Sequence, residues 1–171
     1  MHYSILLTQL IHHLGMVDGR KKFQKIVHIL QSAGAPFEER FEYANFGPYS
    51  ATLQAEIHSL CEFGYLKEAP DGMSFQFTAG EHFSKIENED FVQNTPTWAM
   101  FAKSLNQKTP RELEALSTVL FLQRLGYDEA SIEQKFARLK PHLNHHYHWA
   151  IAMAVKINNA PGNWEKLTEA N

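Results

Sequence analysis

The chain has 171 residues, a length that fits one domain or two small subdomains packed together. Hydrophobic residues make up 44% of it and charged residues 20%, proportions typical of a globular protein with a buried core. The single cysteine, Cys61, excludes a disulfide framework within the chain and a zinc site built from several cysteines, and it fits a reducing compartment.

The net charge of −3 is divided unevenly along the chain. Residues 1–94 carry seven Lys and Arg against twelve Asp and Glu, whereas residues 95–171 carry nine against seven. Proteins that bind nucleic acid usually have a basic face, because contacts with phosphate supply most of the affinity. The acidic first half therefore argues against DNA as a partner, although charge can be local.

The N-terminal segment does not have the pattern of a signal peptide. It is short of positive charge, and His12 and His13 follow its apolar run. No apolar stretch approaches the roughly 20 residues that cross a bilayer. We therefore expect a soluble, cytoplasmic protein without a membrane partner.

The first half is predicted to contain a short helix over residues 3–14 and then two amphipathic helices. The first amphipathic helix covers residues 19–33, where apolar residues recur at i, i+3, i+4 and i+7. These residues are Phe23, Ile26, Val27 and Leu30. A short strand over residues 41–46 and a Gly47-Pro48 turn follow.

Ser50 is predicted to cap the second amphipathic helix, which Gly64 ends. A hairpin comes next, with strands over residues 65–69 and 73–77 around the turn Pro70-Asp71-Gly72. The order helix, helix, hairpin predicts a winged helix-turn-helix. Thr78 and Glu81 then have the spacing of a capping box, which predicts the start of another helix.

The second half is predicted to be helical. The polar stretch over residues 88–94 marks a boundary, so the chain divides into a winged-helix-like subdomain (1–92), a helical subdomain (93–160) and a loosely ordered tail (161–171). Helices are expected to start at Thr95-Pro96 and Thr109-Pro110, where a capping residue precedes a proline. Further helices cover residues 110–125, the region of Ile132 to Leu139, and residues 142–158. The predicted fold class is mainly α with a small β-hairpin.

The basic cluster at the start of helix 19–33 is a candidate partner-binding surface. It consists of Arg20, Lys21, Lys22 and Lys25. Lysines there oppose the helix dipole, which suggests a compensating interaction, although a solvated helix start is the simpler alternative. The loop with Phe46 and Tyr49 fits closure of the core, which we favour, or a binding surface. The leading hypothesis is a protein partner that contacts both regions.

The alternative is a DNA-binding regulator. The helix after Ser50 would read bases through Thr52, Gln54 and His58, while Arg20, Lys21 and Lys22 would contact phosphates. Only Gln54 suits base reading well, and Glu56 and Glu62 would repel phosphate. A homodimer formed through the helical half would supply two half-sites.

Three histidines form a weaker candidate metal site. On a helix, His142, His145 and His146 share one face at i, i+3 and i+4, a spacing that can bind zinc or nickel. No carboxylate lies nearby in sequence to orient them, so incidental histidines at a solvated helix start are the alternative.

No pattern predicts an enzyme. Cys61 falls on the apolar stripe of its helix, which favours a buried residue over a nucleophile. There is no Gly-x-Ser-x-Gly motif, and the glycine spacing around Gly15 and Gly19 does not fit a P-loop. We assign no catalytic residues and no cofactor.

Three segments of the first half resemble the YwgA-like family of small bacterial proteins, and more remotely the Panacea (SocA-like) domain of antitoxins and phage-related proteins. They are residues 19–27, 46–50 and 64–66, with Leu53, Ile57 and Leu60 between the last two. The Panacea domain has a helix with Gln-Lys before two hydrophobic residues, as at Gln24–Val27, and a later aromatic Gly-Pro turn. The resemblance implies a winged-helix-like fold and a protein partner, often a toxin, without catalytic residues.

The predicted function is therefore a non-enzymatic regulatory or protein-interaction module, with an antitoxin-like role as one form of it. The helical second half departs from a free-standing antitoxin and counts against toxin neutralisation.

Overall fold

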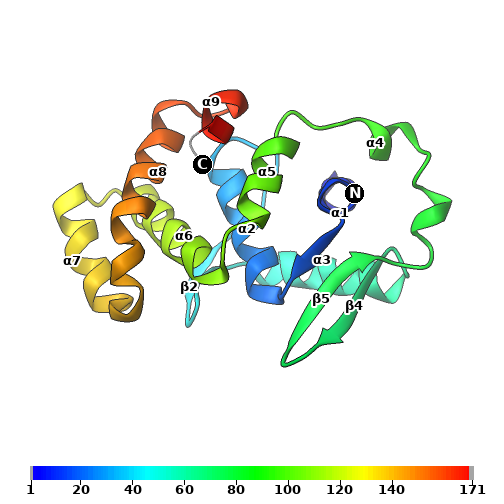
Figure 1. Ribbon diagram of the computed structural model, residues 1–171, viewed down its shortest axis with the longest axis horizontal. Coiled ribbons are helices and arrows are strands. Elements are labelled where there is room, and N and C mark those ends of the chain that lie inside the picture. Colours follow the sequence, from blue (N-terminus) through cyan, green and yellow to red (C-terminus); the bar gives the residue numbers. More distant parts are fainter. Residues whose placement is uncertain (1, 170–171) are drawn as a thin grey trace.

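The computed structural model describes residues 2–169 and shows a mainly helical protein with a small antiparallel sheet (Figure 1). The elements of the first half are α1 (His2–Leu14), β1 (Met16–Asp18), α2 (Arg20–Ser32), β2 (Glu42–Ala44), β3 (Gly47–Tyr49), α3 (Ala51–Glu62), β4 (Leu66–Asp71) and β5 (Ser74–Ala79). The elements that follow are two 3-10 turns, η1 (Phe83–Lys85) and η2 (Pro141–His146), and the helices α4 (Asp90–Gln93), α5 (Ala99–Asn106), α6 (Pro110–Arg124), α7 (Glu129–Leu139), α8 (Tyr147–Asn159) and α9 (Trp164–Glu169).

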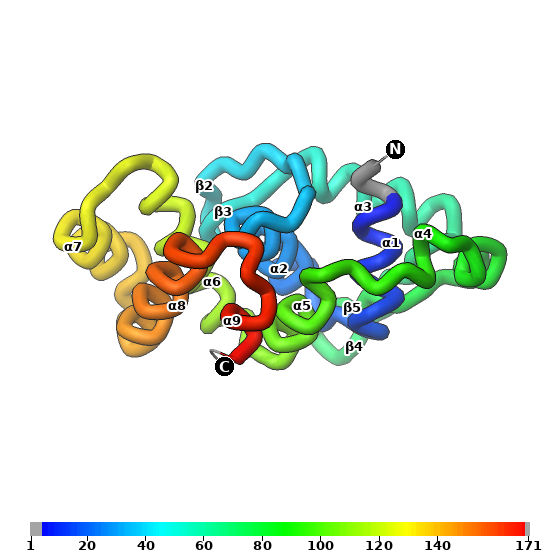
Figure 2. The backbone as a smooth tube through the Cα atoms, turned by 90° about the horizontal axis from the view of Figure 1, so that it is seen from above, coloured from blue at the N-terminus to red at the C-terminus, as the bar shows by residue number. Residues whose placement is uncertain are grey.

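Helix α2 lies at the centre of the molecule, between the sheet with α1 and α3 on one side and α6, α7 and α8 on the other (Figures 1 and 2). Its predicted apolar face is confirmed, since Phe23, Ile26 and Val27 are fully buried. One cluster of buried apolar side chains continues through both halves, from Leu7 in α1 to Leu167 in α9. The two predicted subdomains therefore share a core.

The sheet has the strand order β1-β5-β4, and all of its neighbours are antiparallel. In its register Val17 lies opposite Phe77, and both side chains are buried. Phe77 packs edge-on against Phe23 of α2, with 5.2 Å between the ring centroids. The hairpin of β4 and β5 was predicted, but its turn lies at Gly72-Met73, because Pro70 and Asp71 pair with Phe75 and Ser74. Strand β1 was not predicted, because three residues give too short an alternation to read.

Two predicted helix starts and one helix end are confirmed. The Ser50 hydroxyl accepts a hydrogen bond from the Leu53 amide at the start of α3. Thr109 and Glu112 form the predicted capping box of α6. Gly64 follows α3 with a φ of +76°, the left-handed conformation that favours glycine at a helix end.

Two other predicted helix starts are wrong. Thr78 lies in β5, opposite Met16 and Lys67, so its backbone belongs to the sheet and no capping box forms with Glu81. Thr95-Pro96 does not begin α5, which starts at Ala99 without a side-chain cap.

The predicted loose tail is also wrong for residues 164–169, which form α9. The Leu167 side chain is fully buried, and the Trp164 ring lies 5.9 Å from that of Phe101. The remaining tail residues 170 and 171, and residue 1 of the first predicted subdomain, lie outside the described residues.

Within residues 2–169, every helix is too short or too polar to cross a membrane.

Candidate functional site

The β2–β3 hairpin is the element around which the site is built. The predicted Gly47-Pro48 turn is wrong: the turn lies at Asn45–Phe46, while Gly47 and Pro48 form β3 and are buried. Gly47 has a φ of +88°, and a Cβ there would lie 3.1 Å from the Thr118 hydroxyl of α6. Both the left-handed backbone conformation and the close approach of the hairpin to α6 therefore favour glycine at this position.

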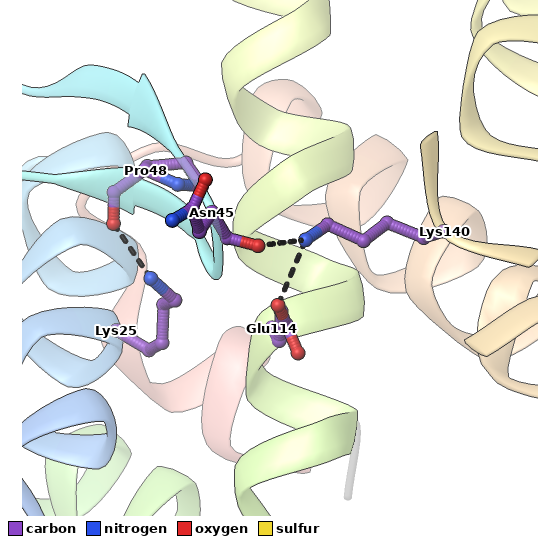
Figure 3. A network of polar contacts seen from close by, with 5 residues as sticks. All are labelled: Lys25, Asn45, Pro48, Glu114 and Lys140. Carbon is purple, nitrogen blue, oxygen red and sulfur yellow. Dashed lines mark hydrogen bonds and ion pairs between the residues drawn. The ribbon is translucent and has the colours of Figure 1, made fainter. Parts of the chain in front are cut away.

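Two lysines hold the hairpin from opposite sides (Figure 3). Lys25 Nζ, on α2, donates to the Pro48 carbonyl at 2.6 Å. Lys140 Nζ, beyond α7, donates to the Asn45 carbonyl at 3.1 Å and pairs with Glu114 of α6 at 2.9 Å. The side chains of Lys25, Glu114 and Lys140 are all largely buried, so water competes little for these hydrogen bonds.

Burial lowers the pKa of Lys25 to about 8, a decrease that nearby Lys140 and Lys21 favour and Glu114 opposes. Lys25 is 3% exposed, so its side chain offers a partner little surface. It fixes the hairpin and lies beneath the exposed groups described below.

Gln24, the neighbour of Lys25, makes two hydrogen bonds to the backbone that follows the hairpin. Its Nε2 donates to the Ser50 carbonyl and its Oε1 accepts from the Ser50 amide, both at 2.9 Å. The Ser50 hydroxyl lies 3.2 Å from the Glu39 carboxylate, which also accepts from Thr52. The Gln24-Lys25 pair and the Pro48–Ser50 segment, which the sequence presents separately, are thus in direct contact.

A groove of roughly 380 Å³ runs between the hairpin, α2 and α3. Its lining includes five of the six predicted partner-binding side chains, Arg20, Lys21, Lys25, Phe46 and Tyr49, together with Gln54. Phe46 is 53% exposed and Tyr49 is 40% exposed. The Lys21 ammonium lies 3.3 Å from the centroid of the Phe46 ring, a cation–π contact at the tip of the hairpin. We call this the aromatic groove.

Arg20 and Lys22, two other basic residues of the predicted cluster, already have partners within the protein. Arg20 pairs with Glu68 of β4 at 2.5 Å and lies over the Phe75 ring, and the hydrogen bond to Glu68 raises the Arg20 pKa. Lys22 is buried and donates to the Asn106 carbonyl, and burial lowers its pKa. Lys22 therefore does not belong to an accessible surface.

A second groove of roughly 490 Å³ lies on the other side of Phe46, towards the start of α6. Its lining is Lys21, Lys25, Phe46, Thr109, Pro110, Arg111, Glu114 and His142. We call this the basic groove. Arg111 was not predicted from the sequence, because it lies 90 positions from Lys21 and only the packing of α2 against α6 brings them to one groove.

Only one of the three α3 residues predicted to read DNA bases lines the aromatic groove. Gln54 lines the aromatic groove, but the Thr52 hydroxyl is bound to Glu39. His58 faces Glu62 on the same helix, with 3.4 Å between Nε2 and Oε1. Helix α3 thus presents a carboxylate beside one of its three candidate base-reading groups.

The histidine prediction assumed an α-helix, and that assumption is wrong. His142, His145 and His146 belong to η2, a 3-10 helix in which i and i+3 align but i+4 does not. His142 lines the basic groove, while His145 and His146 stack with 3.9 Å between ring centroids. No three His, Cys, Asp or Glu side chains of the described residues are placed to hold a metal ion.

His28 is a further buried polar residue that sequence reasoning did not single out. Its Nδ1 lies 2.6 Å from the hydroxyl of Ser117, and its ring packs edge-on against Phe41. Burial, with the charges of Lys25 and Arg124, lowers its pKa to about 3. Ser117 is fully buried, and the pair joins α2 to α6.

The fold and the site define a mainly helical protein whose inserted hairpin displays aromatic side chains between two grooves. This chain belongs to the YwgA family. It is 31% identical, over 137 residues, to the uncharacterized protein YwgA of Bacillus subtilis (strain 168), an alignment that covers 76% of this chain and 80% of that protein. No family model matches the chain, and no solved structure matches it.

Proposed function

We propose that the protein is a non-enzymatic interaction module that binds a protein partner across the aromatic groove. The observation that carries this proposal is the exposure of Phe46 and Tyr49 on a hairpin held by two buried lysines. Aromatic side chains on a rigid element make strong binding contacts because little conformational entropy is lost when a partner covers them. A toxin as the partner would give the module the antitoxin-like role that the resemblance implies.

The strand order supports a winged-helix-like first half. The elements α1, β1, α2, α3, β4 and β5 follow one another as in that fold, with a sheet of order β1-β5-β4 and the β2–β3 hairpin inserted between α2 and α3. In a DNA-binding winged helix, α3 would enter the major groove. Here α3 carries Glu56 and Glu62, while Arg20 and Lys22 are paired or buried, which favours a protein partner over DNA.

The test is an affinity purification from the native host at moderate salt, with nuclease-treated and untreated lysates compared by mass spectrometry. The bait is compared with a Phe46→Ala/Tyr49→Ala variant and with Phe63→Ala, which truncates an aromatic residue that is 66% exposed and lies outside both grooves. Lys22 is left unchanged because it is buried.

We expect a nuclease-resistant partner that the Phe63 variant retains and the double variant loses by about tenfold or more, with unchanged circular dichroism. Equal retention by both variants would contradict the proposal. Partners that disappear after nuclease treatment would favour the DNA-binding alternative.

A further inference from the structure

We propose that the aromatic and basic grooves form one site for an acidic segment of the partner, with an apolar side chain in the first groove and carboxylates in the second. This inference rests on the proposed function and specifies the chemistry of what is bound.

The two grooves adjoin each other, because they share lining residues. Lys21, Lys25 and Phe46 line both of them, so the Phe46 ring forms a ridge with the aromatic groove on one side and the basic groove on the other. A partner segment that covers Phe46 therefore reaches both grooves. The ridge is fixed in place by the contacts of Asn45 and Pro48 with Lys140 and Lys25.

The basic groove has an excess of positive charge. Lys21, Lys25 and Arg111 line it with His142, whereas Glu114 is the single carboxylate among its lining residues. Glu114 is already neutralised by Lys140, at 2.9 Å. This concentration of cations on a chain with a net charge of −3 gives the groove a sign opposite to that of the whole protein.

Lys25 adds a specific attraction for an anion. It is removed from water, and its ammonium group, which has three N–H donors, makes one hydrogen bond in the structure, to Pro48. A carboxylate in the basic groove would lie in the field of a charge that water screens poorly, where an ion pair is stronger than at an exposed site.

The geometry favours a short acidic peptide segment over a nucleic acid. The aromatic groove is lined in large part by apolar and aromatic residues, including Ala44, Phe46 and Tyr49. Such a lining suits a hydrophobic side chain better than a phosphate backbone. Beyond Gln54, the carboxylates of Glu56 and Glu62 would repel the charges that a nucleic acid continues to present on both sides. A peptide can place its acidic residues on one side only.

The experiment selects peptides from a phage-displayed library of random dodecapeptides on the immobilised protein. Parallel selections use a Lys21→Glu/Arg111→Glu variant and a matched control, Lys67→Glu/Lys85→Glu, which makes the same charge change at two exposed lysines that line neither groove. Circular dichroism establishes that all three proteins are folded.

We expect the native protein and the matched control to enrich peptides in which Asp or Glu residues adjoin Leu, Ile or Phe. A synthetic peptide of the enriched sequence should bind the groove variant about tenfold or more weakly, with an affinity that decreases as salt increases. Enrichment of neutral or basic peptides, no enrichment, or an equal loss in the matched control would overturn the inference.

The two proposals fail in distinguishable ways. If Phe46→Ala/Tyr49→Ala releases the native partner but Lys21→Glu/Arg111→Glu retains it, a partner binds the aromatic groove and the acidic chemistry is wrong. If both variants retain the partner, the partner does not bind the aromatic groove and the proposed function is wrong. Binding of a duplex oligonucleotide that Lys21→Glu/Arg111→Glu abolishes would assign the basic groove to nucleic acid instead.

Discussion

Polar residues on α2 hold distant parts of the chain in place. Gln24 binds the backbone of Ser50, Lys25 that of Pro48, and Gln31 that of Glu39. Sequence periodicity identified the apolar face of this helix, but Lys22 and Lys25 were predicted to belong to an accessible partner-binding surface. Helical spacing shows which face a residue occupies and not whether another segment covers that face, so the buried contacts needed the tertiary structure.

The buried His28 predicts a loss of stability in acid. The folded protein keeps His28 neutral down to a pKa of about 3, whereas the unfolded chain binds the proton near the ordinary value of 6.5. Between these values the unfolded state binds more protons, so the free energy of unfolding falls as pH decreases below about 6.5. The expected contribution of His28 is a decrease of about 2 kcal/mol from pH 7 to pH 5, measured by urea unfolding.

His28→Leu removes the titrating group and serves as the comparison. The variant is less stable at pH 7, because Ser117 loses its partner, but its stability should change less between pH 7 and pH 5 than that of the native protein. An equal pH dependence in the two proteins would show that His28 is not held neutral by burial.

Local sequence motifs predicted some elements correctly and others wrongly, depending on which segments pack against them. The same Thr-x-x-Glu spacing occurs at Thr78–Glu81 and Thr109–Glu112, yet only the second forms a capping box. Thr78 pairs with strands on both sides, an alternative that a local motif does not reveal. Likewise Gly47-Pro48 fits a turn locally but forms β3, because the hairpin packs against α2 and α6.

Gly47→Ala is predicted to disturb the hairpin more than an equivalent change elsewhere. Gly47 and Gly126 have similar left-handed φ values, +88° and +93°, but only at Gly47 would a Cβ meet other atoms, the nearest being the Thr118 hydroxyl. Both substitutions should cost about 1–2 kcal/mol for backbone strain. Gly47→Ala should cost about 1–3 kcal/mol more for the close contact.

Urea unfolding of the two glycine variants measures this difference. Because the Phe46 ridge is adjacent to Gly47, the Gly47 variant should also bind the partner more weakly, while the Gly126 variant binds normally. Equal stability of the two variants would show that the hairpin is not held against α6 as described.

The whole molecule has a shared core where the sequence suggested a boundary. The polar stretch over residues 88–94 contains α4, whose Val92 is buried, and Gln9 of α1 donates to the Phe91 carbonyl. Composition predicted the polar character of this stretch but not its packing against α1, because that contact joins residues more than 80 positions apart.

We therefore predict a single unfolding transition. All three tryptophans lie in the second half, at Trp98, Trp149 and Trp164, so their fluorescence reports on that half, whereas far-UV circular dichroism reports on helices of both. The two signals should give the same urea midpoint. Separate midpoints would mean that the halves unfold independently despite the shared core.

The central claim is that the exposed face of the β2–β3 hairpin contacts a protein partner. The most direct measurement is photo-crosslinking in the native host, with p-benzoylphenylalanine introduced in place of Phe46 and, as the control, in place of Phe63. We predict a discrete protein adduct from position 46 that is absent at position 63. Adducts at neither position, the same adducts at both, or adducts only to nucleic acid at position 46 would contradict the claim.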